Sequence, residues 1–237
     1  MSNQNRTMKQ YLDPNEHMKL PYITRQFRWR LPLEAGQLVA KLTYKSFDKC
    51  FDKTKIKCFL PERGMELQDT AVTSNQREVL LAALKYTEPI NLPVVEIGAW
   101  RGATTVALAA ATSRKIYAVD PFGNYFAAES DMKIMLDRTR SFSHVKHIRS
   151  SSGDAAKALV QERFSLVFID AIHDYINAWF DFLVWERLLV PGGMLVFHDV
   201  DDHIGTNLAC RRILHRKNYK VWGYCPNMVA FKKDSDA

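Results

Sequence analysis

After about residue 70 the sequence alternates between short apolar segments and longer helical ones. The apolar segments are rich in Val, Ile and Phe and are predicted to be strands, at 94–98, 115–120, 144–149, 164–170 and 193–200. Helices are expected between them, at about 75–87, 102–112, 130–141, 154–162, 177–190 and 205–217. Such alternation builds a mostly parallel sheet with helices on both faces, so the sequence predicts a doubly wound α/β fold.

The start and the end of this region carry sequence signals for a helix cap and for a hairpin. Ser74 is expected to cap the first helix. The segments 219–225 and 227–233 flank Pro226-Asn227 and are expected to form an antiparallel hairpin, which completes a seven-stranded sheet. Ligands in such folds bind where the parallel strands end, so the residues that follow each strand are the candidate site.

Residues 1–70 are less regular, and they are interpreted as a basic extension ahead of a domain at 71–237. Four prolines interrupt them, with a predicted helix at 33–47 and a basic, aromatic stretch at 27–30 that is a candidate lid. We expect the extension to contribute to substrate binding or oligomerisation.

Composition excludes some classes of protein. No apolar run approaches the roughly 20 residues of a bilayer span, and the polar N-terminus is unlike a secretory signal. The four cysteines form no CxxC pair, which indicates free thiols in a cytoplasmic protein. The net charge of +7 comes largely from the first 60 residues and is interpreted as a solvated basic face, with an anionic substrate, membrane surface or polymer as alternatives.

The turn after the first strand of the alternating region indicates a nucleotide site without phosphates. It reads Gly98-Ala99-Trp100-Arg101-Gly102, so a tryptophan stands where a dinucleotide site needs its middle glycine. Glu96 is expected to direct negative charge at the pocket, which suits the ammonium and sulfonium groups of S-adenosylmethionine. Asp120, 22 positions after Gly98, is placed to accept hydrogen bonds from a ribose.

The ordered set "EIGAWRGATT", "AVDPF", "SSSGDA", "VFIDAIHDY" and "LLVPGGMLVFHDV" resembles the class I S-adenosylmethionine-dependent methyltransferases. It is most similar to the branch of catechol-type and bacterial sugar and antibiotic O-methyltransferases, over about residues 73–232. The resemblance implies a cofactor site whose parts are assigned as follows. The methionine loop is Glu96, Gly98 and Gly102, the ribose ligand is Asp120, the adenine neighbours are Ser151, Ser152 and Asp154, and Asp170 also contacts the cofactor. Phe122 packs either on the adenine or in the core.

The resemblance also implies a divalent ion, Mg²⁺, which would hold the acceptor oxygens between Asp170 and Asp199. Two carboxylates at the ends of neighbouring strands repel one another unless they are protonated or bridged by a cation. Val200 departs from the family pattern, which often has an amide or acid there, so Asp201 or Asp202 is the alternative further ligand. The competing interpretation is that Asp170 and Asp199 cap helices or bind the acceptor directly.

His173 takes the place of the family's lysine base, and together with Asp170 it is the predicted catalytic pair. An imidazole with a pKa near 6.5 accepts a hydroxyl proton at neutral pH. The alternative for His173 is a helix cap. His198 either supports the site or packs in the sheet.

Three functions remain open at this point. The first is an O-methyltransferase for a small hydroxylated acceptor such as a sugar, phenol or natural product. The second is a nucleic-acid methyltransferase or binder, although the chain lacks an N/D-P-P-Y/F motif. The third is a non-catalytic cofactor-binding assembly protein. The oligomeric state is left open, with a homodimer among the alternatives.

Overall fold

The structure is a computed structural model that describes residues 46–123 and 125–236. The predicted lid at 27–30 and the predicted helix at 33–47, apart from its last two residues, lie outside this range. None of the helices in the described ranges has the length and apolar character that a membrane span needs.

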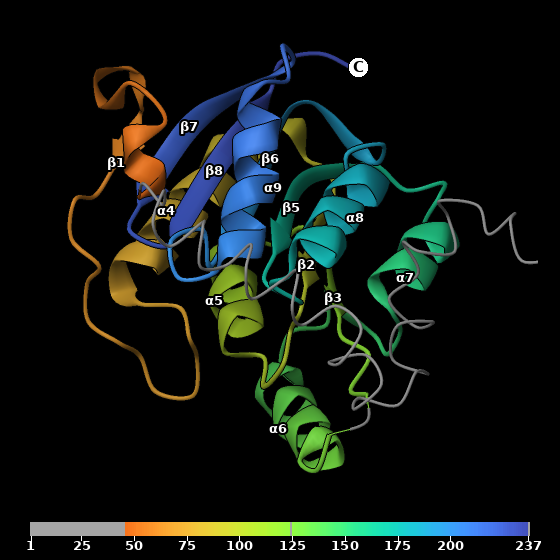
Figure 1. Ribbon diagram of the computed structural model, residues 1–237. Coiled ribbons are helices and arrows are strands. Elements are labelled where there is room, and N and C mark those ends of the chain that lie inside the picture. The colour runs from red at the N-terminus through yellow and green to blue at the C-terminus, as the bar shows by residue number, and fades with distance from the viewer. Residues whose placement is uncertain (1–45, 124, 237) are drawn as a thin grey trace, which may run out of the picture.

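A single sheet runs through the described residues, with strands in the order β1-β7-β8-β6-β5-β2-β3-β4 (Figure 1). The strands are β1 (Cys58–Phe59), β2 (Val94–Ile97), β3 (Ile116–Val119), β4 (Val145–Ile148), β5 (Phe164–Ile169), β6 (Leu189–His198), β7 (Tyr219–Cys225) and β8 (Met228–Lys233). Only β8 is antiparallel to its neighbours β6 and β7. The predicted fold class is confirmed, including the terminal hairpin.

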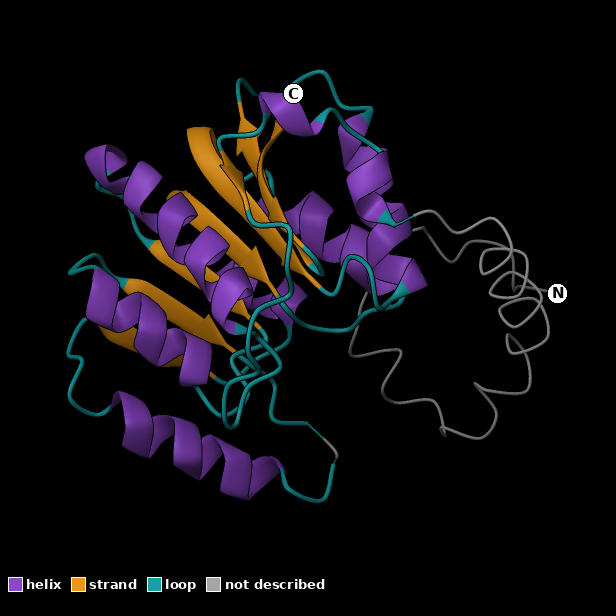
Figure 2. Ribbon diagram, turned by 90° about the vertical axis from the view of Figure 1, so that its left-hand side faces the viewer, coloured by secondary structure: helices purple, strands orange, loops and turns teal. Residues whose placement is uncertain are grey.

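Helices cover both faces of this sheet (Figure 2). The α-helices are α4 (Ser74–Tyr86), α5 (Ala103–Ala111), α6 (Ala128–Thr139), α7 (Ser152–Ala158), α8 (Tyr175–Trp185) and α9 (Ile204–Leu214). Three short 3₁₀ helices are η1 (Phe47–Lys49), η2 (Lys53–Lys55) and η3 (Glu88–Ile90). The apolar side chains of α7, α8 and α9 belong to one core layer, and those of α4, α5 and α6 belong to the other.

Strand β1 is an eighth strand that the sequence did not predict. It pairs with β7 in parallel, with Cys58 opposite Gly223 and Phe59 opposite Tyr224. The rings of Phe59 and Tyr224 are stacked, with centroids 6.1 Å apart, and Phe47 is fully buried in the same core layer. The hydrophobic core is therefore extended at this edge of the sheet by Phe47, Phe51, Ile56 and Phe59.

The start of α4 differs from the prediction by one residue. Thr73, rather than Ser74, is the N-cap, because Gln76 at the third helical position accepts a hydrogen bond from the Thr73 N–H at 2.7 Å. Ser74 is the first helical residue, and its hydroxyl oxygen accepts the N–H of Met65 at 2.9 Å. Gln76 is consequently buried at the helix start, where it also reaches the functional site.

Candidate active site

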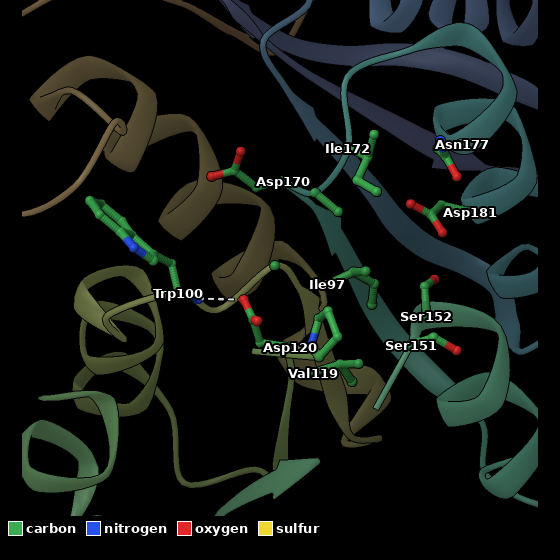
Figure 3. A pocket seen from close by; sticks show the side chains of 13 residues that line it. Ile97, Trp100, Val119, Asp120, Ser151, Ser152, Asp170, Ile172, Asn177 and Asp181 are labelled. Atoms are coloured by element: carbon green, nitrogen blue, oxygen red, sulfur yellow. Dashed lines mark hydrogen bonds between the residues drawn. The ribbon is translucent and has the colours of Figure 1, made fainter. Parts of the chain in front are cut away.

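The candidate site lies where the order of the sheet reverses. Strand β2 pairs with β3 on one side and with β5 on the other, so the connections leave it in opposite directions and open a crevice at the carboxyl ends of the strands. A cavity of about 250 Å³ occupies this position. It is lined by Ile97, Gly98, Trp100, Val119, Asp120, Pro121, Ser151, Ser152, Asp170, Ala171, Ile172, Asn177 and Asp181 (Figure 3).

Gly98 is required at the bottom of this crevice because two strands approach closely there. Its φ is +92°, which L side chains rarely adopt. A Cβ on Gly98 would lie 1.9 Å from the backbone oxygen of Asp170. The glycine therefore allows the end of β2 to touch the end of β5. Gly102 has a φ of +74° as the N-cap of α5, packs against Met135 and is not in the cavity wall.

Asp120 holds two loops at one side of the cavity. Its Oδ2 accepts the N–H of Trp100 at 2.9 Å (Figure 3). Its Oδ1 accepts the N–H of Phe122 at 2.8 Å. Both of these residues have a φ of +42°, so the carboxylate stabilises an unusual backbone. Burial raises the pKa of Asp120, although the two backbone hydrogen bonds partly offset this. Asp120 lines the cavity, as its predicted ribose-binding role requires.

The rest of the cavity combines apolar walls with a polar side. The apolar walls are formed by Ile97, Val119, Pro121, Ala171 and Ile172. Across from Asp120, the polar groups come from α7 and α8: Ser151, Ser152, Asn177 and Asp181 (Figure 3). The sequence predicted the two serines and missed the two residues of α8. Ser151 is the N-cap of α7 and accepts the N–H of Asp154, while Asp154 itself is not in the wall.

Besides Gly102 and Asp154, the structure corrects two further predicted contacts with the pocket, Glu96 and Phe122. Glu96 is 1 % exposed, is hydrogen-bonded by the Thr105 hydroxyl of α5, and lines neither of the two cavities described here. Burial raises the pKa of Glu96 to about 8, so it is neutral at pH 7 and directs no charge at the pocket. Phe122 is a core side chain rather than part of the cavity wall, because its ring is turned into the layer beneath α5 and α6.

A second cavity of about 200 Å³ adjoins the first, and Gly98, Trp100 and Asp170 line both. Its wall also includes His173 and Asp199, at the ends of β5 and β6, and Asp69 and Arg101 from two loops. Asp69 receives hydrogen bonds from Arg101 at 3.2 Å and from Arg138 at 2.7 Å. These two arginines fix the loop before α4 beside the cavity.

Histidines and carboxylates cluster at the wall of this second cavity. Asp199 Oδ2 lies 2.7 Å from His173 Nε2, and Asp199 Oδ1 lies 3.3 Å from His198 Nδ1. Asp170 Oδ1 lies 3.2 Å from His198 Nδ1 and 3.9 Å from His173 Nε2. The ring of His203 stacks on that of His173 with centroids 4.3 Å apart. The sequence predicted that Asp170, His173 and Asp199 would meet, but it missed His203.

The charges of this cluster depend on one another. Burial disfavours a charged His173, but Asp170 and Asp199 outweigh it and raise the pKa of His173 to about 9. The same carboxylates overcome the burial of His198 and raise its pKa to about 10. In return, the histidines lower the pKa of Asp199 far below its usual value in spite of burial. The expected pKa of 6.5 for His173 is therefore wrong, because two carboxylates stabilise its proton.

Gln76 determines which nitrogen of His198 faces the carboxylates. The Gln76 amide is oriented by the Thr73 N–H, which its oxygen accepts, and by the Pro226 carbonyl, to which its nitrogen donates at 3.0 Å. The same amide oxygen lies 3.0 Å from His198 Nε2, which must therefore be the N–H donor. A neutral His198 would then present the lone pair of Nδ1 to Asp170 and Asp199. A proton or a cation is needed at that position.

The donor set fits a divalent metal ion. Two overlapping groups, Asp170-His198-Asp199 and His173-Asp199-His203, each place three ligand atoms within 4.8 Å of one another. His198 is 1 % exposed, and its Nδ1, like His173 Nε2, has no hydrogen bond of acceptable direction within the described residues. Carboxylate and imidazole ligands suit Mn²⁺, Fe²⁺ or Zn²⁺ as well as Mg²⁺.

The alternative ligands Asp201 and Asp202 lie outside both donor groups. Asp201 accepts hydrogen bonds from the Phe47 N–H at 2.8 Å and from the Tyr224 hydroxyl at 2.8 Å, so it ties η1 to the sheet edge. Asp202 pairs with Arg63 at 3.0 Å. The sequence analysis did not identify Asn227 as part of the site. Its side-chain N–H donates to Asp199 at 2.8 Å and orients that carboxylate toward the histidines.

Comparisons with known proteins agree with this geometry. Residues 95–200 match the model of a methyltransferase domain family. CalS11, a TDP-rhamnose 3'-O-methyltransferase in calicheamicin biosynthesis, is 16% identical with a TM-score of 0.53, over 67% of this chain and 80% of that chain. The O-methyltransferase NovP is 12% identical with a TM-score of 0.55, over 70% and 82%. An O-methyltransferase from Bacillus cereus, in complex with SAH, is 19% identical with a TM-score of 0.52, over 70% and 84%.

At these identities the structural likeness shows the fold alone, and the family match covers a little less than half of the chain. A comparison with curated protein sequences finds no match. The matched residues begin in β2 and end directly after β6, so they include the crevice and the histidine-carboxylate cluster apart from His203. The match over residues 95–200 and the shared fold agree with the resemblance to class I S-adenosylmethionine-dependent methyltransferases that the sequence motifs indicated.

Proposed function

We propose that the protein is an O-methyltransferase that transfers the methyl group of S-adenosylmethionine to a small hydroxylated acceptor, such as a sugar or phenol, with a divalent metal ion. The observation that carries this proposal is the cluster of Asp170, His173, His198 and Asp199 at the meeting point of two cavities. A cation beside the acceptor favours an oxygen acceptor, because divalent ions bind oxygen ligands and lower the pKa of a bound hydroxyl.

The first cavity is the proposed cofactor site. Asp120 uses two of its acceptor positions for backbone N–H groups and has others left for ribose hydroxyls. The apolar walls suit a flat base, and Ser151 and Ser152 lie at its proposed edge. Methionine would extend past Gly98 toward Asp170, where the two cavities join.

The second cavity is the proposed acceptor site. Its volume of about 200 Å³ limits the part of the acceptor that enters to about one ring. Asp69 and Arg101 add polar groups to its wall, which suits an acceptor with several hydroxyls. Holding two reactants in line within such a site supplies much of the rate enhancement in a displacement reaction.

When bound, S-adenosylmethionine supplies an electrophilic methyl group, and a divalent ion at the cluster supplies charge that lowers the pKa of an acceptor hydroxyl. Asp170 and Asp199 would hold the ion, with His198 as the nitrogen donor of the same group. His173 lines the acceptor cavity and is the proposed recipient of the hydroxyl proton. The carboxylates that hold the proton on His173 are those that would hold the ion, so metal binding and protonation of His173 compete.

The test has two parts. Isothermal calorimetry with S-adenosylhomocysteine, with and without Mn²⁺ or Mg²⁺, measures cofactor and metal binding. Methyl transfer to a panel of sugars and phenols is then followed by mass spectrometry, with an EDTA control. No heat with the nucleoside under any condition would refute the cofactor assignment, and full activity in EDTA would refute the metal.

A further inference from the structure

Asp181 is a buried carboxylate for which the fold alone gives no reason. It lies on α8, is 3 % exposed, and lines the first cavity on the side opposite Asp120 (Figure 3). Its Oδ1 has no hydrogen-bond donor among the described residues, and it forms no ion pair with a described Lys, Arg or His. An unpaired buried acceptor costs about 1–3 kcal/mol, which indicates that a ligand satisfies it.

Ser152 is the neighbouring residue that donates a hydrogen bond to Asp181. Ser152 accepts a hydrogen bond from Trp185 Nε1 at 2.9 Å, so its own hydroxyl proton is available to Asp181, to which it donates. Burial raises the pKa of Asp181 to about 7, with the Ser152 hydrogen bond opposing this rise and the charge of Asp174 adding to it. The serine is thus one partner of the carboxyl group, and Asp181 lies with Ser152 among the residues that line the cavity (Figure 3).

The shape of the cavity indicates which donor reaches Asp181. If Asp120 binds the ribose, the base lies between the apolar walls and its far edge faces Ser151, Ser152 and Asp181. The amine on C6 is the group that distinguishes that edge of adenine, and it is a hydrogen-bond donor. Resting on the proposed function, we propose that Asp181 accepts a hydrogen bond from the adenine amine and makes the pocket select adenine over hypoxanthine.

A merely structural role for Asp181 predicts something different. If it only stabilised α7 and α8 through Ser152 and Trp185, its replacement would change stability without changing the choice of base. Hypoxanthine carries a carbonyl oxygen in place of the amine, so its lone pairs would face those of an ionised Asp181. A site built around a donor commonly rejects an analogue that lacks it.

The experiment compares two ligands, S-adenosylhomocysteine and S-inosylhomocysteine, by isothermal calorimetry at pH 8.5, where Asp181 is ionised. For the wild-type protein we expect the inosine compound to bind at least about tenfold more weakly. In D181N the amide has one donor and one acceptor and can pair with either base. The preference should then fall to below about threefold, while a surface control, D137N, keeps the wild-type ratio.

The outcomes separate the two proposals. Wild-type binding of both compounds with equal affinity would overturn the role of Asp181 and leave the cofactor assignment standing. Binding of neither compound would overturn both. An unchanged preference for the adenine compound in a folded D181N would also overturn the role of Asp181. If D181N fails to fold, as thermal unfolding would reveal, the wild-type ratio alone decides.

Discussion

Replacement of Asp120 by alanine tests the cofactor site most directly. The carboxylate has about four acceptor positions, of which two are used by the N–H groups of Trp100 and Phe122. The remaining two match the two hydroxyls of a ribose. D120A removes all four, and it also releases two residues whose φ of +42° the carboxylate holds.

The magnitude follows from the bonds that are lost. A hydrogen bond to a charged group contributes about 1.5–3 kcal/mol, so two ribose hydrogen bonds correspond to about 3–6 kcal/mol. Since 1.4 kcal/mol is a factor of ten, D120A should weaken S-adenosylhomocysteine binding by roughly 10²–10⁴-fold. Relaxation of the loops after β2 and β3 would add to this loss.

Calorimetry on the wild type, D120A and D137A measures this difference. Asp137 is an exposed aspartate of α6 that pairs only with Arg140, three residues on, among the described ion pairs. D137A therefore controls for the loss of one negative charge, and we expect its affinity to match the wild type. A D120A protein with an intact fold and an affinity within threefold of wild type would refute the ribose assignment.

Three further variants test other parts of the site. G98A should lower the free energy of unfolding by at least about 2 kcal/mol, or roughly 4–8 °C in Tm, because of its φ and the 1.9 Å approach to Asp170; an unchanged Tm would contradict this. The pKa of Glu96 is raised from 4.5 to about 8 on folding, so the wild-type protein loses up to about 1.4 kcal/mol of stability per pH unit as the pH rises through that window. E96Q should therefore gain in Tm over wild type between pH 5 and pH 8, and a constant difference would count against a buried neutral Glu96. D199N keeps a backbone with a φ of +59°, which asparagine tolerates, and should bind Mn²⁺ at least about tenfold more weakly by electron paramagnetic resonance; equal affinity would argue against Asp199 as a ligand.

The fold was predictable because its signals are local. The apolar strands and the helices between them have the periodicity of buried parallel sheets and covering helices, and every predicted strand appears in the sheet. Strand β1 escaped prediction because it has two residues and pairs with a strand more than 160 positions later. No local pattern distinguishes such a strand from a loop.

The wrong predictions for the proposed cofactor site concern the direction in which side chains point from their strand or helix. All four residues of β2 are buried, because both faces of the sheet are covered, and Glu96 turns to Thr105 instead of the cavity. A polar residue at 177 and another at 181 stand four apart in an otherwise apolar helix. That spacing places them on one buried face, and it was the available signal for Asn177 and Asp181.

The histidine-carboxylate cluster shows where prediction from sequence ends. Asp170 directly follows β5 and Asp199 directly follows β6. Because these two strands pair in parallel, the sheet alone brings the two aspartates close together. His203 and Asn227 approach through loops, and Gln76 reaches His198 from the start of α4, 122 positions earlier in the chain. The amide of Gln76 nevertheless decides that His198 turns Nδ1 toward both carboxylates, and this decides that a proton or a cation is needed between them. A chain with the same two aspartates but a leucine at position 76 would leave that nitrogen free to carry either a proton or a lone pair, and we expect its affinity for Mn²⁺ to be about 10–100-fold weaker.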